Sequence, residues 1–582
     1  MTSPDLRLLG FPVYRALDRF QTTTRQLCAG AYLEPGFGET VIRELVEDER
    51  RAVAPSFGFD VEPVVRHALR ARRLRLATSF ALAVLVLVGL RFTPVFTVGW
   101  LAIGFVVAGW RTPLMRALSP RTRRWVVLGV LGAVGAAVCC IAGSLLFALF
   151  GVLQKVQSAM GTSGTGGVSG TSASAGGSGA DQAPPDLGSL AALLIPLALA
   201  VLTFGVLLAY RLRVNAILAT ELAADRPGFR PETHSDRVRR RLAKIAAAQY
   251  GNIVVHERDP FLGCGMSVSD GSDDWSFALR LRPAEDGGGP VLPLGELTDG
   301  LYGGIRSAVE GMRDAGLPEG ARIANLEFLP HLVADGRMDV DDPLLSPDRR
   351  MPYAYAADEL IDAIRRCPQG GLRYYERIVV SGPGNPVRTG AGTEVLPPRV
   401  AGVDISVFVH VAVEGGMLYT EFLSRVLPPV RERFELVDTM RPRVAGWLAV
   451  REALRAMPAD SAASGWRILT GLARMARTGL RMAASGRDTE LSRVHDYGAR
   501  LSVRAAAADP VIVKYLQLLD TAKYVKLIER AVSESILRFL QDGGYDIAEF
   551  AQRVNHIQNF HGDLTFHGGQ QAFGGTSTFH QN

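Results

Sequence analysis

The sequence predicts a multi-domain membrane protein: a four-helix transmembrane anchor plus a cytoplasmic α+β domain and a C-terminal helical region. Three observations predict this class. Four apolar runs between residues 76 and 210 contain no charged side chain, residues 246–440 hold several strand-like segments, and residues 441–555 carry apolar positions at helical spacing. At 582 residues, the chain has room for three or four domains of ~150 residues.

The composition excludes several classes of protein. Hydrophobic residues make up 48 % and charged residues 21 %, which excludes a disordered or fibrous chain. Five cysteines are too few and too scattered for a disulfide framework or a CxxC zinc site. The net charge of +6 arises with only 5 Lys among 64 basic residues, and this bias indicates a GC-rich bacterial genome more than a binding function.

Residues 1–72 form the first expected element, a cytoplasmic helical segment beneath the membrane. The first 70 residues are polar and mixed in character, so we expect no signal peptide. Residues 73–210 then form the anchor, because a spanning helix needs ~20 apolar residues. The expected spans are residues 76–90, 93–110, 125–153 and 189–210.

Arg91 and Pro94 predict a tight helical hairpin between the first two spans. A single helix over 76–110 would be far longer than a ~30 Å hydrocarbon core. Arginines cluster before the first span, between the second and third, and after the fourth, so the positive-inside rule places both termini in the cytoplasm of a plasma-membrane protein. The spans contain no ionisable side chain, which disfavours a transporter or channel.

Two segments that flank the fourth span are polar. Residues 154–188 are dominated by Gly, Ser, Thr and Ala, and we expect a flexible exterior loop there. Residues 211–245 form a basic juxtamembrane segment that ends in the run DRVRRRLAK, residues 236–244. This run is either a solvated helix face that fixes topology or a patch drawn to the anionic inner leaflet, at ~1 kcal/mol per charge.

Residues 246–440 are expected to fold as an α+β domain, because strands joined by short turns alternate with inserted helices. The segment Glu414-Gly415-Gly416 predicts a hairpin between the last two strands. The expected strands are residues 252–256, 275–281, 322–328, 373–381, 404–413 and 417–423, with helices at about 296–315 and 354–366.

No enzyme signature emerges from this domain. Its Gly-rich segments at 261–265 and 382–386 lack the residues that hold phosphates or dinucleotides, and the chain contains no GxSxG nucleophile elbow. The acidic stretch 335–342 with His331 matches no calcium-loop spacing. We therefore expect no catalytic, cofactor-binding or metal-ligating residues, no cofactor, and no nucleic-acid partner.

Residues 441–555 are expected to be helical, and Trp466–Met482 has the pattern of a basic amphipathic helix. Ile468, Leu472, Met475 and Met482 centre on the side opposite its arginines. The helix either lies in a bilayer interface or packs its apolar face on the domain. The candidate membrane-interface residues are Trp466, Arg467, Arg474, Arg477 and Arg481.

The segment from Pro510 to about Leu540 predicts a longer helix, and residues 556–582 follow as a low-complexity tail. Four phenylalanines recur in the tail at steps of 6, 7 and 6 among Gln, Asn, Gly and Thr. The tail is either disordered or stacks in register with a partner. The candidate assembly residues are Phe560, Phe566, Phe573 and Phe579.

Three blocks of the sequence resemble uncharacterised multi-pass membrane proteins of actinobacteria that have a large cytoplasmic C-terminal region. The blocks are RQLCAGAYLEPGF near the start, NIVVHERDPFLGCG with DDWSFALRL, and LSVRAAAADPVIVKYLQLLDTAKYVKLIERAVSESILRFLQDGGYDIAEFAQRVNHI. The resemblance covers about half of the chain, discontinuously. It implies an architecture and carries over no catalytic residues.

Two functional hypotheses follow. The first is a non-enzymatic sensor or scaffold in the plasma membrane, with a cytoplasmic recognition domain and a tail that assembles or recruits a partner. Its expected partners are the lipid bilayer and a protein, or a second copy of the chain, bound through the C-terminal region. The alternative is a membrane-bound enzyme of unrecognised type with its site in the α+β domain.

Overall fold

The structure is a computed structural model that describes residues 17–110 and 187–561, apart from short internal gaps. The gaps are residues 224–229, 234, 268–273, 285–293, 315, 318–321, 324, 347–350, 384–386, 389–393, 397–399, 440–441, 485–492, 511 and 513–514. The expected span 125–153, the exterior loop up to residue 186, and Phe566, Phe573 and Phe579 lie outside the described residues.

The chain divides into two compact units that interleave along the sequence. The sheet unit comprises Met1–Ala71, Leu222–Thr439 and Thr478–Asn582, and the bundle unit comprises Arg72–Glu221 and Met440–Arg477. The sequence predicts consecutive domains with a boundary at residue 440, and the structure differs from this division. Residues 441–555 do not form one helical region, because they contribute to both units.

A seven-stranded sheet organises the sheet unit, in the order β1–β4–β6–β9–β10–β2, with β3 also paired to β10. All neighbouring pairs are antiparallel except β1 with β4, which confirms an α+β fold. The strands are β1 (Ile253–Val255), β2 (Met266–Ser267), β3 (Trp275–Arg280), β4 (Leu326–Ala334), β6 (Leu372–Pro383), β9 (Val400–Glu414) and β10 (Met417–Leu427).

The hairpin predicted at residues 414–416 is confirmed as the β9–β10 connection. Gly415 and Gly416 both have positive φ, +56° and +74°, as a two-residue type I′ turn requires. The strand expected at 322–328 is shifted, because β4 begins at Leu326 and continues through Pro330 to Ala334. The sequence-based prediction ends before Pro330, which lacks a backbone N–H and is usually absent from inner strands.

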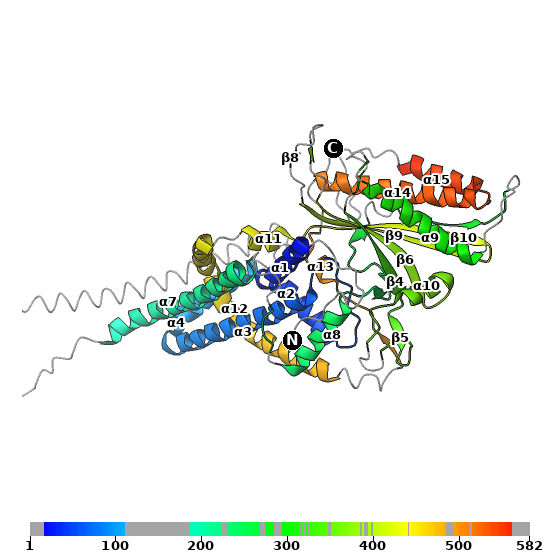
Figure 1. Cartoon of the computed structure of the whole chain (residues 1–582). Helices are drawn as coiled ribbons and strands as arrows, with labels where there is room; N and C mark the ends of the chain where they lie inside the picture. The colour runs from blue at the N-terminus through cyan, green and yellow to red at the C-terminus, as the bar shows by residue number, and fades with distance from the viewer. Residues whose placement is uncertain are drawn as a thin grey trace, which may run out of the picture. The chain divides into compact units, whose positions relative to one another are not determined.

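Helices α9 (Leu294–Glu310) and α14 (Tyr515–Asp542) pack together on the sheet (Figure 1). The apolar positions of α14 at helical spacing, among them Val525, Ile528 and Val532, are fully buried in one core with strands β3, β9 and β10. The other helices beside this core are α10 (Asp358–Arg366) and α15 (Ala548–His561), which contains Phe560.

The N-terminal residues of the sheet unit are helical, as expected. They form α1 (Leu17–Leu33), α2 (Pro35–Ile42) and the π-helix η2 (Arg43–Glu47), and ion pairs join them to distant parts of the chain. The remaining short elements of this unit are α8 (Asp236–Ala248), η4 (Gly311–Arg313), β5 (Arg337–Asp339), β7 (Val387–Arg388), β8 (Glu394–Leu396), α11 (Glu432–Thr439), β11 (Val494–Asp496) and α13 (Val503–Ala506).

Among the described residues, four helices lie wholly or mostly in the bundle unit, three of them at expected spans. These are α3 (Val61–Phe92), α4 (Pro94–Trp110), α7 (Leu187–Ala216), which continues as the π-helix η3 (Ile217–Glu221), and α12 (Pro442–Ala484). The chain reverses at Thr93, and Trp100 of α4 packs beside Leu82 of α3, so the expected hairpin is present (Figure 1).

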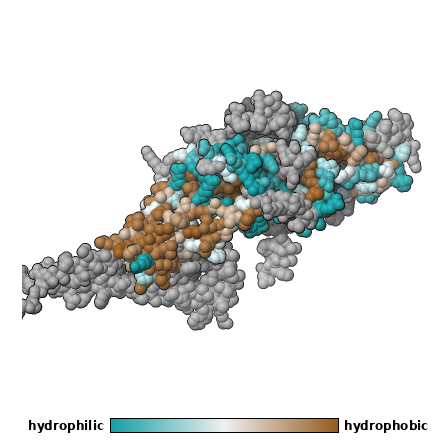
Figure 2. Space-filling view, turned by 90° about the horizontal axis from the view of Figure 1, so that it is seen from below, coloured by the Kyte–Doolittle hydropathy of each residue, from teal (hydrophilic) through white to brown (hydrophobic). Residues whose placement is uncertain are grey.

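Two helices among the described residues are long and apolar enough to cross a membrane. They are Val61–Phe92 and Leu194–Glu221, and only 17 % and 6 % of their apolar windows are buried. A core helix of a water-soluble protein would instead be buried, so these helices indicate membrane association. Large apolar side chains, including Phe80, Leu87, Val95 and Val201, gather on the exposed surface of the bundle unit (Figure 2).

Candidate functional site

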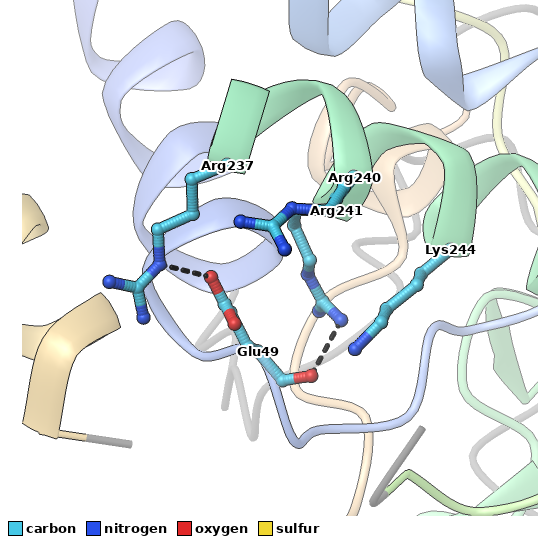
Figure 3. A pocket seen from close by; sticks show the side chains of 5 residues that line it. All are labelled: Glu49, Arg237, Arg240, Arg241 and Lys244. Carbon is cyan, nitrogen blue, oxygen red and sulfur yellow. Dashed lines mark hydrogen bonds and ion pairs between the residues drawn. The ribbon is translucent and has the colours of Figure 1, made fainter. Parts of the chain in front are cut away.

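Four basic residues of α8 lie on one face because they are spaced at i, i+3, i+4 and i+7. These residues are Arg237, Arg240, Arg241 and Lys244, and together with Glu49 they line a cavity of about 370 Å³ (Figure 3). The lining holds four cations and one carboxylate, which gives the pocket a net charge of +3. We call this cavity the basic pocket.

Arg241 fixes one wall of the basic pocket and is only 2 % exposed. Its guanidinium donates to the backbone carbonyls of Leu45 at 2.8 Å, Asp48 at 2.9 Å and Glu49 at 2.8 Å, and also contacts the Met351 sulfur. Burial lowers the pKa of Arg241 to about 10, so the side chain stays charged at neutral pH. It therefore ties α8 to the end of η2.

The remaining charged groups of the pocket are less constrained. Arg237 donates to the Glu49 carboxylate at 3.1 Å, and its side chain is 43 % exposed. Arg240 is exposed, and among the described residues its guanidinium has no hydrogen-bond partner. In Figure 3 the side chains of Arg237 and Arg240 extend toward the Glu49 carboxylate. The pocket thus presents the Arg240 guanidinium beside an ion pair between Arg237 and Glu49.

The π-helix η2 connects the basic pocket to the C-terminal end of α12. Thr478 donates to the buried Glu47 carboxylate at 2.7 Å, and the Arg481 guanidinium lies 3.7 Å from its other oxygen. π-Helical turns occur often at functional sites. Here the Leu45 carbonyl of the turn and the Asp48 and Glu49 carbonyls just after it accept from Arg241, and Glu47 of the turn accepts from Thr478 near the end of α12.

The candidate membrane-interface residues lie along α12 with their side chains outward. Trp466 is 70 % exposed, and Arg474 and Arg477 are also exposed. Arg467 forms an ion pair with Asp460 at 2.8 Å, whereas Arg481 lies near Glu47. The structure therefore does not gather these residues into one site but spreads them along one helix.

Helix α12 packs on its neighbours through small residues and Met457, and several of its other large apolar residues are exposed. A Cβ at Gly471 would collide with Leu76 of α3, and a Cβ at Gly104 of α4 would collide with the Pro458 carbonyl of α12. By contrast, Leu469 is 64 % and Leu480 70 % exposed. Leu469 and Leu480 therefore lie away from the side of α12 that packs on protein.

A row of polar side chains crosses one face of the sheet, and the sequence gives no local signal for it. Strand register pairs His331 with Tyr375, and Glu421 with both His410 and Ser276, and the rings of Tyr375 and His410 lie 5.2 Å apart between centroids. Tyr375 donates to the Glu421 carboxylate at 2.8 Å, and the His410 Nδ1 lies 2.7 Å from the Tyr374 carbonyl oxygen. Only the register, which is set by long-range pairing, brings these residues together.

Burial keeps the His331, His410 and Tyr375 side chains of this polar row uncharged. Burial lowers the pKa of His331 to about 3, with Arg377 contributing, and burial also lowers the pKa of His410. Burial and the Glu421 carboxylate raise the pKa of Tyr375. The nearby Cys264 thiol is buried, and its pKa is raised, so it stays protonated. Across the part of the chain that the structure describes, no group of three His, Cys, Asp or Glu residues could hold a metal ion.

Comparison with known proteins gives one match. The family described as "AbeC-like domain" matches residues 274–578, which is more than half of the chain and extends from β3 to the C-terminal tail. No curated protein and no solved structure matches the chain.

Proposed function

This chain belongs to the AbeC-like family, and we propose that it acts as a membrane-anchored, non-enzymatic sensor or scaffold. In this proposal the bundle unit is part of a four-helix plasma-membrane anchor with both chain termini in the cytoplasm. The sheet unit is the cytoplasmic recognition domain. The tail after residue 555 recruits a protein partner or a second copy of the chain. We also propose that this chain is related to multi-pass membrane proteins of actinobacteria.

The observation that carries the membrane part of this proposal is the exposed apolar side of α12. Trp466, Leu469 and Leu480 are each at least 64 % exposed on the same helix. Burying a large apolar side chain stabilises a protein by about 1.5–3 kcal/mol, so exposing several to water forgoes that stabilisation. A bilayer interface supplies the missing apolar surroundings and takes the flanking arginines among its headgroups.

The sheet unit supports recognition better than catalysis. Its described polar row contains neutral histidines and a tyrosine bonded to Glu421, and its buried thiol is protonated. None of these groups is an activated nucleophile. An enzyme of unrecognised type, the alternative function, would use the half-buried His410 and Tyr375 of this row.

Quenching of tryptophan fluorescence by brominated phosphatidylcholine tests the placement of α12. The full chain is reconstituted into vesicles, and Trp466→Phe is compared with Trp275→Phe, a core position that is 8 % exposed. If Trp466 contacts lipid, its replacement removes a quenched component of the emission, whereas replacement of Trp275 removes an unquenched one. Equal quenching of the two components would contradict an interfacial α12.

The tail is tested separately by the size of the detergent-solubilised protein. Light scattering compares the full chain with a variant lacking residues 556–582, and with one in which Phe560, Phe566, Phe573 and Phe579 are serine. Loss of assembly in both variants supports recruitment through the phenylalanines. Unchanged assembly in both removes the tail from the proposal and leaves the anchor intact.

A further inference from the structure

We propose that the basic pocket on α8 binds a phosphate-bearing anion. The net charge of +3 over a cavity of about 370 Å³ is the first observation. Small-molecule sites in proteins commonly measure about 300–1,000 Å³, so the cavity has the size of a ligand site. This inference deepens the proposed sensor role, on which it rests, because it names the chemical group that a sensor would recognise.

The chemistry of the lining selects the class of ligand. All five lining residues are charged, none is aromatic, and the apolar surface of the pocket is that of their side-chain stems. This lining favours an anionic group over an apolar molecule or a stacked nucleobase. Arginine and lysine side chains together match a group with several anionic oxygens, as in a phosphomonoester or diphosphate.

The pocket is preorganised by a residue that does not itself need to bind the ligand. Arg241 directs its donors to three carbonyls and the Met351 sulfur, which holds α8 at a fixed position against η2. Arg240 is then held at the mouth with a guanidinium that no described residue satisfies. The α8 backbone is therefore in place before the ligand arrives, so that only the lining side chains lose conformational entropy on binding.

Glu49 acts as an internal anion in this arrangement. Its carboxylate is 22 % exposed and accepts from Arg237, so it occupies a position that an incoming phosphate would take. Binding therefore exchanges one carboxylate for a more highly charged phosphate group. The geometry makes Glu49 a competitor, and its removal should strengthen anion binding.

The ligand has two sources, a free phosphate compound or the headgroup of a lipid. The full chain is placed in phosphatidylcholine nanodiscs and titrated with inorganic pyrophosphate, and separately placed in nanodiscs that also contain phosphatidic acid. Hydrogen exchange of the α8 backbone amides reports binding in both cases. Protection by pyrophosphate identifies a free phosphate ligand, and protection only with phosphatidic acid identifies a lipid headgroup.

Variants test whether the pocket itself binds the anion. Arg240→Gln and Lys244→Gln should each weaken binding about tenfold, because each removes one charge-assisted hydrogen bond. Glu49→Gln should strengthen binding several-fold. Arg239→Gln is the matched control, because Arg239 pairs with Asp236 outside the pocket and loses the same charge from the same helix. It should change binding less than about twofold.

The inference is overturned if neither pyrophosphate nor phosphatidic acid protects α8, or if Arg239→Gln weakens binding as much as Arg240→Gln. The second result would mean that the anion is attracted by the basic charge of α8 as a whole and not by the basic pocket. The Trp466 quenching measurement is made on the same protein and reports α12 alone. Normal quenching without anion protection rejects the pocket and retains the anchor, and the converse result rejects the interfacial helix and retains the pocket.

Discussion

Helices α12 and α14 are both long and belong to the same predicted helical region. They differ in which side chains they bury. Helix α14 buries Ile528 and Val532 completely against the sheet. Helix α12 instead buries Ala453 and Gly471 and leaves Trp466 at 70 % exposure.

The proposed contact of α12 with lipid, where α14 packs as helices do in water, accounts for this difference. In water, burial of large apolar side chains drives packing, as in α14. Among membrane helices, lipid is as apolar as leucine, so close approach of small residues supplies the contacts instead. Large-to-small changes should therefore damage the sheet unit, and small-to-large changes should damage the bundle unit.

The largest expected effect is at Phe422→Ala in the sheet core. Phe422 is fully buried and stacks on Trp275 at a centroid distance of 5.4 Å. Its removal leaves a cavity and should lower the free energy of unfolding by about 3–5 kcal/mol. Denaturant unfolding in detergent, followed by tryptophan emission, measures this change. A decrease in the free energy of unfolding below about 1 kcal/mol would contradict a core stabilised by buried large apolar side chains.

Gly104→Leu tests the opposite rule in the bundle unit. The added side chain meets the Pro458 carbonyl, which is backbone and cannot rotate away. We expect destabilisation of up to about 3 kcal/mol from overpacking. Gly205→Leu on α7 is the control, since a Cβ there has no atom within 4 Å. Thermal unfolding in detergent distinguishes the two, and equal midpoints would refute close packing of α4 on α12.

Acid should destabilise the sheet unit through His331. Its pKa falls from 6.5 to about 3 on folding, so the unfolded chain binds a proton that the folded chain does not. Stability is therefore full above pH 6.5 and falls as the pH decreases toward 3, by about 2 kcal/mol at pH 5. Unfolding of His331→Asn at pH 7 and pH 5 should show a smaller difference than wild type. An unchanged difference would assign the acid sensitivity to another group.

Leu469→Ser should have the smallest effect on folding, below about 0.5 kcal/mol, because this side chain is 64 % exposed. The same change should reduce contact of α12 with lipid, measured by bromolipid quenching of Trp466. A large loss of stability in detergent would mean that Leu469 packs on protein, and the contrast between the two helices would disappear.

Local patterns predicted the elements of the sheet unit but not their grouping. The hairpin at Gly415-Gly416 and the 3–4 spacing around Ile528 follow from neighbouring residues, and both are present. The structure does divide the chain at residue 440, but the residues after it are shared between both units, because the burial of α14 on the sheet is a long-range contact that periodicity does not encode. The polar row of His331 and Tyr375 depends on strand register for the same reason.

The candidate site was only partly predictable. The basic run of α8 is visible in the sequence, and the spacing from Arg237 to Lys244 places one charged face on a helix. The cavity is not visible, because it requires Glu49 and the backbone carbonyls of Leu45, Asp48 and Glu49, almost two hundred residues earlier. The buried role of Arg241 likewise depends on those carbonyls, since nothing local distinguishes it from Arg240.

The interleaved order of the two units has a consequence for synthesis on the ribosome. Arg51 forms an ion pair with Asp496, which lies 445 positions later in the chain. At about 5–20 residues per second, this partner emerges roughly 20–90 seconds after Arg51. The N-terminal segment must wait through the production of the apolar helices before this ion pair and the one between Arg25 and Asp438 can form. Translation speed should therefore influence the yield of correctly assembled protein.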